Sequence, residues 1–428
     1  MSEPRAPQHW WLADDVVLTL GAGALLVLVG VLAGRPEVAL VAAPLVLVGA
    51  RGVLRHDPDA DLPQVQVRPA GVAEPGRAAA TVELSLPERA GWLRVRLSRA
   101  GHDDRELLLA ARPAFDVTTH SVRTGPQELL GVDVQAIGLG GLTGSEAVRV
   151  PAAMVVVRPR TRRVDAVPVP PTLRGHTGQH ASRRPGDGGD FRDLHPFMPG
   201  DTLRRVDWKV TARLSPDVDA LWVRRTFALA EAHVVILVDS RDDVGPDPTT
   251  WSGSGQVRPD DQTSLDLARA AALSLTRAYV AAGDRVGVED LASLRHPMRP
   301  AAGRRHVERV GRWLSTVRPY GAPRALVRPP RVPAGALVVV VSTFLDGEAA
   351  DLAALWSRAG HRVVAVDVLP PLRRVHLSAR ERLALRLVDV ERSDRLAGLA
   401  AAGVELVGWG AGRADADLRR LTTRRWRR

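Results

Sequence analysis

VVILVDSRDD, residues 234–243, is the stretch that decides the fold of the second half of this chain. A continuous β-branched run of this kind is typical of a strand buried on both faces of a parallel sheet. Similar runs follow it, and helical patterns lie between them, the first of which Thr263 or Ser264 can cap. Alternating strands and helices predict a mostly parallel sheet with helices on both faces. Further strands are expected at 286–288, 337–341, 363–368 and 404–407, and helices at 263–282, 304–317 and 348–359.

On the N-terminal side, residues 62–160 carry a different pattern. Apolar and polar residues alternate in short runs, and turn residues separate the runs. Alternation with a period of two buries one face of a strand, and several such strands at this spacing predict a β-sandwich-like domain. The clearest strands are expected at 81–86, 92–97, 132–137 and 154–157.

The first 55 residues contain two long apolar runs. Residues 16–33 carry no charge, and as a helix they would span about 27 Å, close to the thickness of a bilayer core. Residues 38–54 form a second run, which contains Pro44. Trp10 and Trp11 precede the first run, where indole rings favour the membrane interface. The pattern predicts an N-terminal membrane hairpin of two transmembrane helices.

A signal peptide is the main alternative for this region. Its core would not normally abut two carboxylates, as the first run does at residues 14–15, and no second apolar run would follow it. Arg5 precedes the hairpin and Arg51 and Arg55 follow it, against Arg35 in the connection. The excess of positive charge on loops facing the cytoplasm therefore predicts a multi-pass protein of the bacterial cell membrane whose soluble domains are cytoplasmic.

The composition limits the choice of function. The chain of 428 residues has a formal net charge of +11, but its positive charges are scattered among acidic ones rather than gathered into a stripe. Aromatic residues make up 4%, which is few for a surface that stacks on bases. Nucleic-acid binding therefore rests on charge alone, and no nucleic acid is expected as a partner. The absence of cysteine excludes disulfides and thiolate metal sites.

Residues 161–232 connect the two halves. The first part is rich in Pro, Gly and Arg and predicts an extended connector. The second part contains GDFRDLHPFMPGDTLRRVDWKVTARLSPDVDALWVRR, residues 189–225. This block closely resembles the signature of the domain-of-unknown-function family fifty-eight, bacterial proteins usually encoded beside MoxR-type AAA ATPases. The family's Gly-Asp turn and its Trp-Lys-x-Thr-Ala-Arg segment are present here as residues 200–201 and 208–213.

The resemblance implies an architecture and a partner. It implies a membrane hairpin (1–55), a β domain (62–160), a linker with the signature block (161–232) and a von Willebrand factor A-like, Rossmann-like α/β domain (233–428). It also implies a MoxR-type AAA ATPase as the partner. One departure from the family pattern is that its Leu-Arg-x-Tyr is replaced by a segment with His195 and Phe197. An altered contact with the partner, gated by histidine, is the expected consequence.

The signature block is the candidate site. Trp208 is a large apolar residue among charges, as is common at the centre of protein interfaces, and Lys209 is the single lysine of the chain. Two interpretations stay open: a surface that binds a partner, or a plug between the β and α/β domains. The candidate residues are Asp190, Phe191, His195, Gly200, Asp201, Arg204, Asp207, Trp208, Lys209 and Arg213.

A second candidate is a degenerate metal site after the first α/β strand. The von Willebrand A resemblance implies an Asp-x-Ser-x-Ser motif there, whose oxygen atoms suit Mg²⁺. Asp239 holds the first position, but Arg241 replaces the first serine and Asp243 the second. Because Arg241 introduces a positive charge, we expect it to pair with the neighbouring acids. Mg²⁺ is therefore not expected as a cofactor.

These patterns favour a protein without enzymatic activity. No pairing of a nucleophile with a general base is recognisable in the sequence. The expected function is that of a membrane-anchored adaptor or scaffold that works with a MoxR-type AAA ATPase. The alternatives are a nucleic-acid-binding protein and a hydrolase with an unrecognised site.

Overall fold

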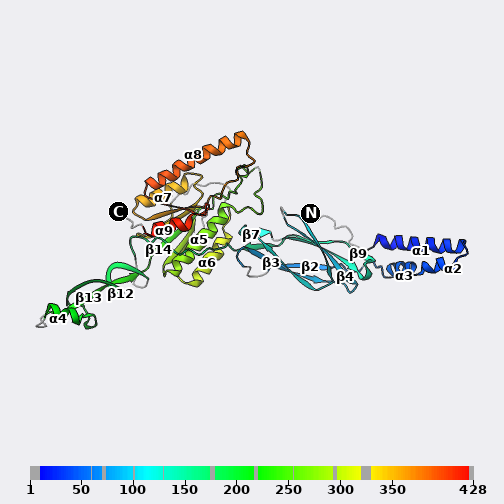
Figure 1. Ribbon diagram of the computed structural model, residues 1–428, viewed down its shortest axis with the longest axis horizontal. Helices are drawn as coiled ribbons and strands as arrows, with labels where there is room; N and C mark the ends of the chain where they lie inside the picture. Colours follow the sequence, from blue (N-terminus) through cyan, green and yellow to red (C-terminus); the bar gives the residue numbers. More distant parts are fainter. Residues whose placement is uncertain are drawn as a thin grey trace. The chain divides into compact units, whose positions relative to one another are not determined.

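A computed structural model describes residues 10–58, 60–69, 74–99, 102–128, 130–173, 179–215, 220–253, 255–292, 296–319 and 329–423, without the side chains of 139 and 181–190. The chain forms two compact units. The first consists of residues 1–121 and 126–157, and the second of residues 122–125 and 158–428. Figure 1 shows the elements of both units, coloured along the sequence.

The first unit begins with apolar helices. These are α1 (Asp14–Leu32), α2 (Pro36–Val41) and α3 (Ala43–Leu54). By length and composition, Asp14–Leu32 and Pro36–Leu54 suffice to cross a bilayer. The expected single second span is divided into α2 and α3, because Pro44 has no N–H to donate to the carbonyl group of Leu40.

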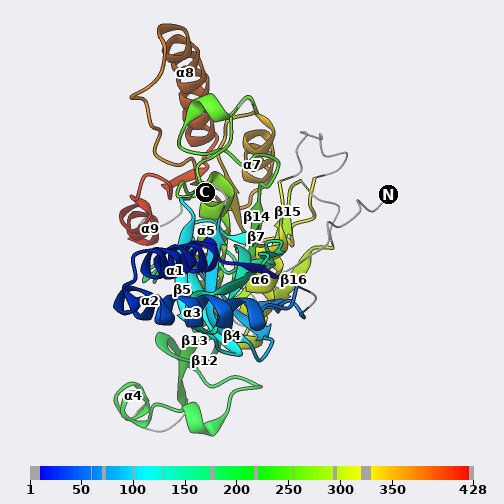
Figure 2. The same cartoon turned by 90° about the vertical axis from the view of Figure 1, so that its right-hand side faces the viewer.

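Glycines let the helices of this hairpin approach closely. A methyl group on Gly23 would lie 2.9 Å from the side chain of Val46, and one on Gly30 would lie 2.7 Å from the backbone nitrogen of Ala39. Figures 1 and 2 both show α1 beside α3. Small residues at the contact are typical of helix pairs within membranes, where backbones can then approach each other.

The rest of the first unit is a β-sandwich. Val82, Val95 and Val134 are fully buried in one core to which both of its main sheets contribute. The first sheet has the order β2 (Gln64–Pro69), β3 (Arg77–Ser85), β6 (Ala114–His120). The second has the order β1 (Trp10–Leu12), β9 (Thr143–Ser145), β8 (Gly131–Gly138), β4 (Ala90–Ser98), β5 (Arg105–Ala110), and β10 (Val148–Val150) pairs with β8. β7 (Gly125–Glu128) pairs with β11 (Met154–Val157), and the 3-10 helix η1 spans Leu139–Gly141.

The expected strands at 81–86, 92–97, 132–137 and 154–157 are confirmed as β3, β4, β8 and β11. Strand β1 was not predicted, and the expected role of Trp10 at the membrane interface is wrong. Trp10 is 4% exposed and belongs to the sandwich core, and its Nε1 donates to the carbonyl oxygen of Asp61 at 3.1 Å. A buried indole whose N–H finds a partner is well suited to a core. The neighbouring Trp11 is 44% exposed.

The second unit contains a six-stranded sheet. Its order is β16 (Met298–Ala301), β15 (Arg285–Asp290), β14 (His233–Val238), β17 (Leu337–Ser342), β18 (Val363–Asp367), β19 (Glu405–Gly408), and only β16 runs antiparallel to its neighbour. The helices are α5 (Ser264–Ala281), α6 (Arg304–Thr316), α7 (Glu348–Arg358), α8 (Ala379–Ala401) and α9 (Ala414–Thr423), with the 3-10 helix η3 at Pro248–Thr250. The expected mostly parallel sheet is confirmed, whereas α8, α9 and β16 were not predicted.

Alternate residues of β14 explain why helices cover both faces of this sheet. Val234, Ile236 and Val238 pack into a core with α5, α6 and α9. Val235 and Leu237 pack into a second core with α7 and α8. A strand that is apolar at every position can serve both cores at once.

The connector before the sheet lacks regular structure from residue 158 to 170 but is fixed to this unit. The hydroxyl group of Tyr279 donates to the carbonyl oxygen of Pro168 at 2.8 Å, and Arg362 donates to that of Val169 at 2.7 Å. The guanidinium of Arg162 lies 3.6 Å from the ring centroid of Trp409. These contacts hold the connector against the α/β body.

A four-residue segment that follows β6 and ends at the first residue of β7, residues 122–125, also belongs to the second unit. Asp266 of α5 is fully buried and accepts hydrogen bonds from the backbone N–H and the hydroxyl group of Thr124, both at 2.7 Å. The same carboxylate completes a capping box with Thr263. Asp266 therefore starts α5 and holds this segment.

The signature block forms an arm. Strand β12 (His180–Pro196) pairs antiparallel with β13 (Trp222–Ala230), with three irregularities in register. The residues between the strands include the 3-10 helix η2 (Leu203–Arg205) and α4 (Trp208–Leu214). Figure 1 shows that the arm extends away from the α/β sheet of the same unit and carries α4 at its end.

Candidate functional site

A tight turn at residues 198–201 leads from β12 into the end of the arm. Gly200 has a φ of 99°, a backbone conformation that favours glycine. The carboxylate of Asp201 accepts a hydrogen bond from the N–H of Met198 at 2.9 Å. Val206 forms an isolated bridge with Val223 of β13. The turn and the bridge fold the chain back against the arm before α4 begins.

Helix α4 is fixed at both its start and its buried side. Asp207 is its N-cap, and the carboxylate accepts from the N–H of Val210 at 3.1 Å. Thr211 is 3% exposed, and its hydroxyl oxygen accepts from the N–H of Trp222 at 2.9 Å. These bonds orient a helix of only two turns that would not be stable alone.

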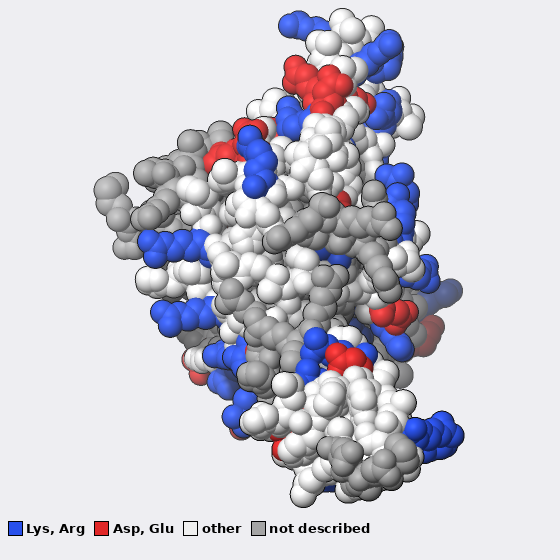
Figure 3. All heavy atoms as spheres, turned by 90° about the vertical axis from the view of Figure 1, so that its left-hand side faces the viewer, with Lys and Arg blue, Asp and Glu red and all other residues white. Residues whose placement is uncertain are grey.

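The arm carries an unusual number of exposed apolar side chains at this end. Trp208 is 62% exposed and Leu203 63% exposed, and three other large apolar residues are also exposed. Three exposed cations lie among them and make no ion pair within the described part of the arm. We call this set the arm-end surface: Phe197, Met198, Leu203, Trp208 and Leu214, with Arg204, Lys209 and Arg213. In Figure 3 the end of the arm, at the bottom, is largely uncharged with basic side chains at its edge.

The other residues of the predicted site lie beside or below this surface. Nε2 of His195 lies 3.4 Å from the carboxylate of Asp201, and neither ring nitrogen has a hydrogen-bond partner among the described residues. Phe191 is half exposed, and the guanidinium of Arg224 lies 5.4 Å from its ring centroid. Asp190 lies on β12, and its side chain is outside those described.

The structure therefore brings together Gly200, Asp201, Arg204, Trp208 and Lys209 at one end of the arm, but not Phe191. Sequence reasoning missed Met198, Leu203 and Leu214, because single apolar residues between charges look like ordinary core positions. It also missed Thr211, whose side chain fixes α4 to β13. The threonine matches the family pattern, but only the fold shows that its hydroxyl group binds β13.

Arg241 of the degenerate metal motif lies at the centre of a group of acidic side chains. Arg241 is 3% exposed, and its Nε and Nη2 donate to the two carboxylate oxygens of Asp239, both at 2.8 Å. Nη2 also donates to Asp346 at 3.0 Å, and Nη1 to Glu348 at 2.5 Å. The hydroxyl group of Ser342 donates to Asp239 at 2.7 Å. The expectation that Arg241 pairs with the neighbouring acids is confirmed.

The charge of Arg241 is strongly favoured in this setting. Burial acts against the charged form, but hydrogen bonds and charges from Asp239 and Asp346 outweigh it, so the pKa of Arg241 lies above its usual value. Asp243, the other predicted ligand, is engaged elsewhere: it accepts from the N–H of Leu265 at 3.3 Å and lies 3.4 Å from Arg123. The two carboxylates of the degenerate motif are thus each paired with a different arginine.

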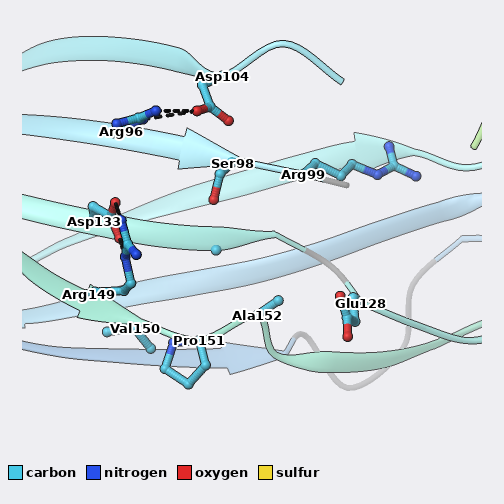
Figure 4. A pocket seen from close by; sticks show the side chains of 11 residues that line it. Arg96, Ser98, Arg99, Asp104, Glu128, Asp133, Arg149, Val150, Pro151 and Ala152 are labelled. Carbon is cyan, nitrogen blue, oxygen red and sulfur yellow. Dashed lines mark hydrogen bonds and ion pairs between the residues drawn. The ribbon is translucent and has the colours of Figure 1, made fainter. Parts of the chain in front are cut away.

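Two surface hollows lie on the first unit. The one in Figure 4, about 420 Å³ on the β-sandwich, is lined by charged residues that neutralise each other, since Arg96 pairs with Asp104 and Arg149 with Asp133. The other, about 580 Å³, lies at the base of the apolar hairpin and includes Arg51. Within the described residues no group of three or more His, Asp or Glu side chains is placed to hold a metal ion.

An apolar hairpin, a β-sandwich and an α/β unit with a projecting arm thus define the class: a modular protein with an exposed apolar surface at the end of the arm. Residues 193–388 match the family described as Protein of unknown function DUF58. An uncharacterized protein of Mycobacterium bovis and one of Mycobacterium tuberculosis are each 31% identical over 208 residues, or 45% of this chain. The match spans about 59% of the length of these curated relatives.

Proposed function

We propose that this chain is a membrane-anchored, non-catalytic adaptor that binds a protein partner through the arm-end surface. The observation that carries the proposal is the exposure of Trp208, Leu203 and Leu214 at the end of a structured arm. Large apolar groups gathered outside a core mark interaction sites in soluble domains. Aromatic and arginine side chains are also the residues that contribute most to protein interfaces.

The electrostatics of this surface favour a partner with acidic groups. Asp201 and Asp207 accept hydrogen bonds from backbone N–H groups, whereas Lys209 and Arg213 are exposed. Complementary charge on a partner would speed association and fix its orientation. The resemblance to a family encoded beside MoxR-type AAA ATPases supports such an ATPase as the partner.

The membrane anchor in this proposal is a hairpin that crosses the bilayer twice. It is supported by the two apolar helical stretches, and by the pairing of β1 with β9 before α1 begins. Because α3 leads back into the same sandwich through β2, both open ends of the hairpin lie on the sandwich side. With the distribution of arginines around the hairpin, this arrangement favours cytoplasmic soluble domains.

For the α/β unit we propose a von Willebrand factor A-like fold. Its support is the parallel strand order around β14 and the cluster of oxygen-bearing side chains of Asp239, Ser342 and Asp346 at the carboxyl ends of β14 and β17. In open α/β sheets this edge is where ligands bind. Here Arg241 takes the position that the resemblance would assign to a cation.

Two substitutions test the partner surface. In a pull-down of the full-length chain by a MoxR-type AAA ATPase, with and without an ATP analogue, Trp208→Ala should weaken capture about tenfold or more, as for an aromatic hot spot. Lys209→Glu should weaken capture too, yet leave the free energy of unfolding within about 0.5 kcal/mol, because Lys209 is exposed.

Matched controls separate a local effect from a general one. Trp92→Ala removes a tryptophan of the sandwich that is 47% exposed, and Arg309→Glu reverses an exposed charge on α6. Both should leave capture unchanged. If Lys209→Glu instead costs about 3–5 kcal/mol of stability, the charge is buried against another domain and the plug interpretation holds. A stable variant with full capture would rule out both interpretations at this residue.

Nucleic-acid binding and hydrolysis are the competing proposals. A steep decrease of DNA affinity with salt would support the first. Turnover of an ester or peptide panel by the purified chain would support the second. Neither has a specific structural observation in its favour.

A further inference from the structure

Helix α8 has one face fixed to the α/β body. Leu385 and Leu399 are buried against it. Arg392 donates to the carbonyl oxygen of Thr343 at 2.8 Å, and Arg395 to that of Phe344 at 2.7 Å. A capping box starts the helix, since Ser378 and Glu381 exchange hydrogen bonds of 2.7 and 3.3 Å. The rotation of α8 about its own axis is therefore well determined.

The opposite face of α8 carries an exposed apolar stripe. Leu383, Leu387 and Val390 are 62%, 60% and 52% exposed. They are spaced by four and then three residues, which places them on one side of a helix. The same alternation continues along the helix through exposed residues at 394, 397 and 401. Alternate spacings of four and three are the pattern by which two helices pack along a common seam.

Charge along this outer face is divided between the two ends. Arg380 and Arg386 are exposed toward the start of α8, and Glu391 and Asp394 are exposed beyond the stripe. None of these four makes an ion pair within the part of the chain that the structure describes. Figure 3, where α8 lies at the top, shows basic side chains near its upper end and acidic side chains below.

We propose that a second copy of this chain docks on the stripe through its own α8, with the two helices antiparallel. A two-fold axis at Leu387 places Arg380 opposite the partner's Asp394, because both lie at the same sequence distance from Leu387. A parallel pair would place Arg380 against the partner's Arg380. The charge distribution is thus complementary to itself only in the antiparallel arrangement, as an isologous interface requires.

The small size of the stripe indicates how strongly the two copies would associate. Three apolar residues per copy form a small contact, which is typical of transient association. Tethering both copies to one membrane would raise their effective concentration and favour the paired state. This step rests on the proposed membrane anchor, whereas the helix pairing itself does not.

Because the chain contains no cysteine, an introduced thiol is the only one that a thiol-reactive cross-linker can modify. In the full-length chain, Leu387→Cys introduces one thiol at the proposed axis, and a short bis-maleimide should link two copies. Ala400→Cys is the control, because it is exposed on the same helix but lies off the stripe. The expected result is a covalent dimer for Leu387→Cys and at least about fivefold less for Ala400→Cys, since only the former places both thiols at the seam.

Charge exchange then tests the orientation. In the Leu387→Cys background, Arg380→Asp or Asp394→Arg alone should reduce the dimer yield about fivefold or more, since like charges are juxtaposed. The two changes together should restore it. Equal yields at 387 and 400, or failure of the double exchange to restore the dimer in a folded chain, would overturn the proposal. Cross-linking of Leu387→Cys to a different protein instead would assign the stripe to that protein.

Discussion

Arg241 shows how a single residue can determine the chemistry of a cluster of carboxylates. Its guanidinium is bound by Asp239, Asp346 and Glu348. We expect millimolar Mg²⁺ to leave the melting temperature of the natural chain unchanged. Arg241→Ala should cost about 3–5 kcal/mol, because it removes a buried arginine and leaves the buried carboxylate of Asp239 without its ion pair.

The same variant should then respond to Mg²⁺. Asp239, Asp346 and Ser342 would present oxygen atoms to a hard cation once the guanidinium is gone. At 100 times its dissociation constant, Mg²⁺ would stabilise the variant by about 2.7 kcal/mol. Thermal melts with and without Mg²⁺ measure both effects. A Mg²⁺-dependent shift in the natural chain that Asp239→Ala abolishes would contradict the first expectation.

Asp242 offers a prediction about pH. Burial, followed by the charges of Asp239 and Asp346, raises the pKa of Asp242 above its usual value. A carboxyl group whose pKa is raised on folding stabilises the fold at low pH, and this contribution is lost as pH rises through the folded-state pKa. Asp242→Asn should therefore raise stability at pH 7.5, by less than about 1 kcal/mol because water screens this partly exposed group.

The dependence on pH serves as the internal control for this variant. The gain should disappear at pH 3, where the natural carboxyl group is protonated in both states. Urea denaturation at the two pH values measures it. An equal gain at both would show that burial of charge is not the cause.

For single residues, the sequence predicts which chemical groups are present better than it predicts which residues they contact. The pairing of Arg241 with acids followed from the charges in the sequence. That Thr211 clamps β13, and that Trp10 is buried rather than at an interface, depended on residues distant in the chain. No local pattern contains that information.

Among the elements, the glycines of the apolar hairpin make a testable contrast. A side chain at Gly23 would collide with Val46 of α3, whereas Gly21 on the same helix has nothing within 4 Å. Gly23→Leu should destabilise the detergent-solubilised chain by about 1–3 kcal/mol, as overpacking does. Gly21→Leu should have little effect. Equal melting temperatures for the two variants would contradict the packing of α1 against α3.

Periodicity predicted most of the strands and helices of both units, because buried faces leave a regular pattern. It failed for β12 and β13, where the arm carries polar and irregular residues, and for α8. Helix α8 has two buried residues and an exposed apolar stripe, so its pattern does not separate an inner from an outer face.

For the whole molecule, the apolar hairpin predicts that the chain sediments with membranes and resists carbonate extraction. Removing the hairpin should release a soluble chain. Strand β1 must be kept in the shortened chain, because it precedes the hairpin and belongs to the sandwich. Deletion of residues 1–56 also removes Trp10 from the sandwich core. Replacement of residues 14–55 by a short Gly-Ser linker keeps it, since Val16 and Gly52 are adjacent at the base of the hairpin.

We expect both shortened chains to be soluble and only the linker version to keep full stability. In that version Trp10→Ala should cost about 3–5 kcal/mol, the usual range for a buried tryptophan. Trp11→Ala should cost much less, because Trp11 is 44% exposed. Urea denaturation of the linker version and of its Trp10→Ala and Trp11→Ala variants measures the three free energies of unfolding. Recovery of the full-length chain in the soluble fraction would instead contradict the membrane hairpin.

The pairing of β1 with β9 also orders events during synthesis. Trp10 leaves the ribosome long before its partner Ser145, and the apolar hairpin emerges between them. A chain stalled before residue 145 would therefore already contain α1, α2 and α3. Its sandwich would still lack the pairing of β1 with β9, and therefore its edge and part of its core. Domains usually complete folding only when their last strand is available. With the membrane anchor proposed above, insertion into the bilayer would precede closure of the sandwich, and the anchor would be in place before the domain it carries is folded.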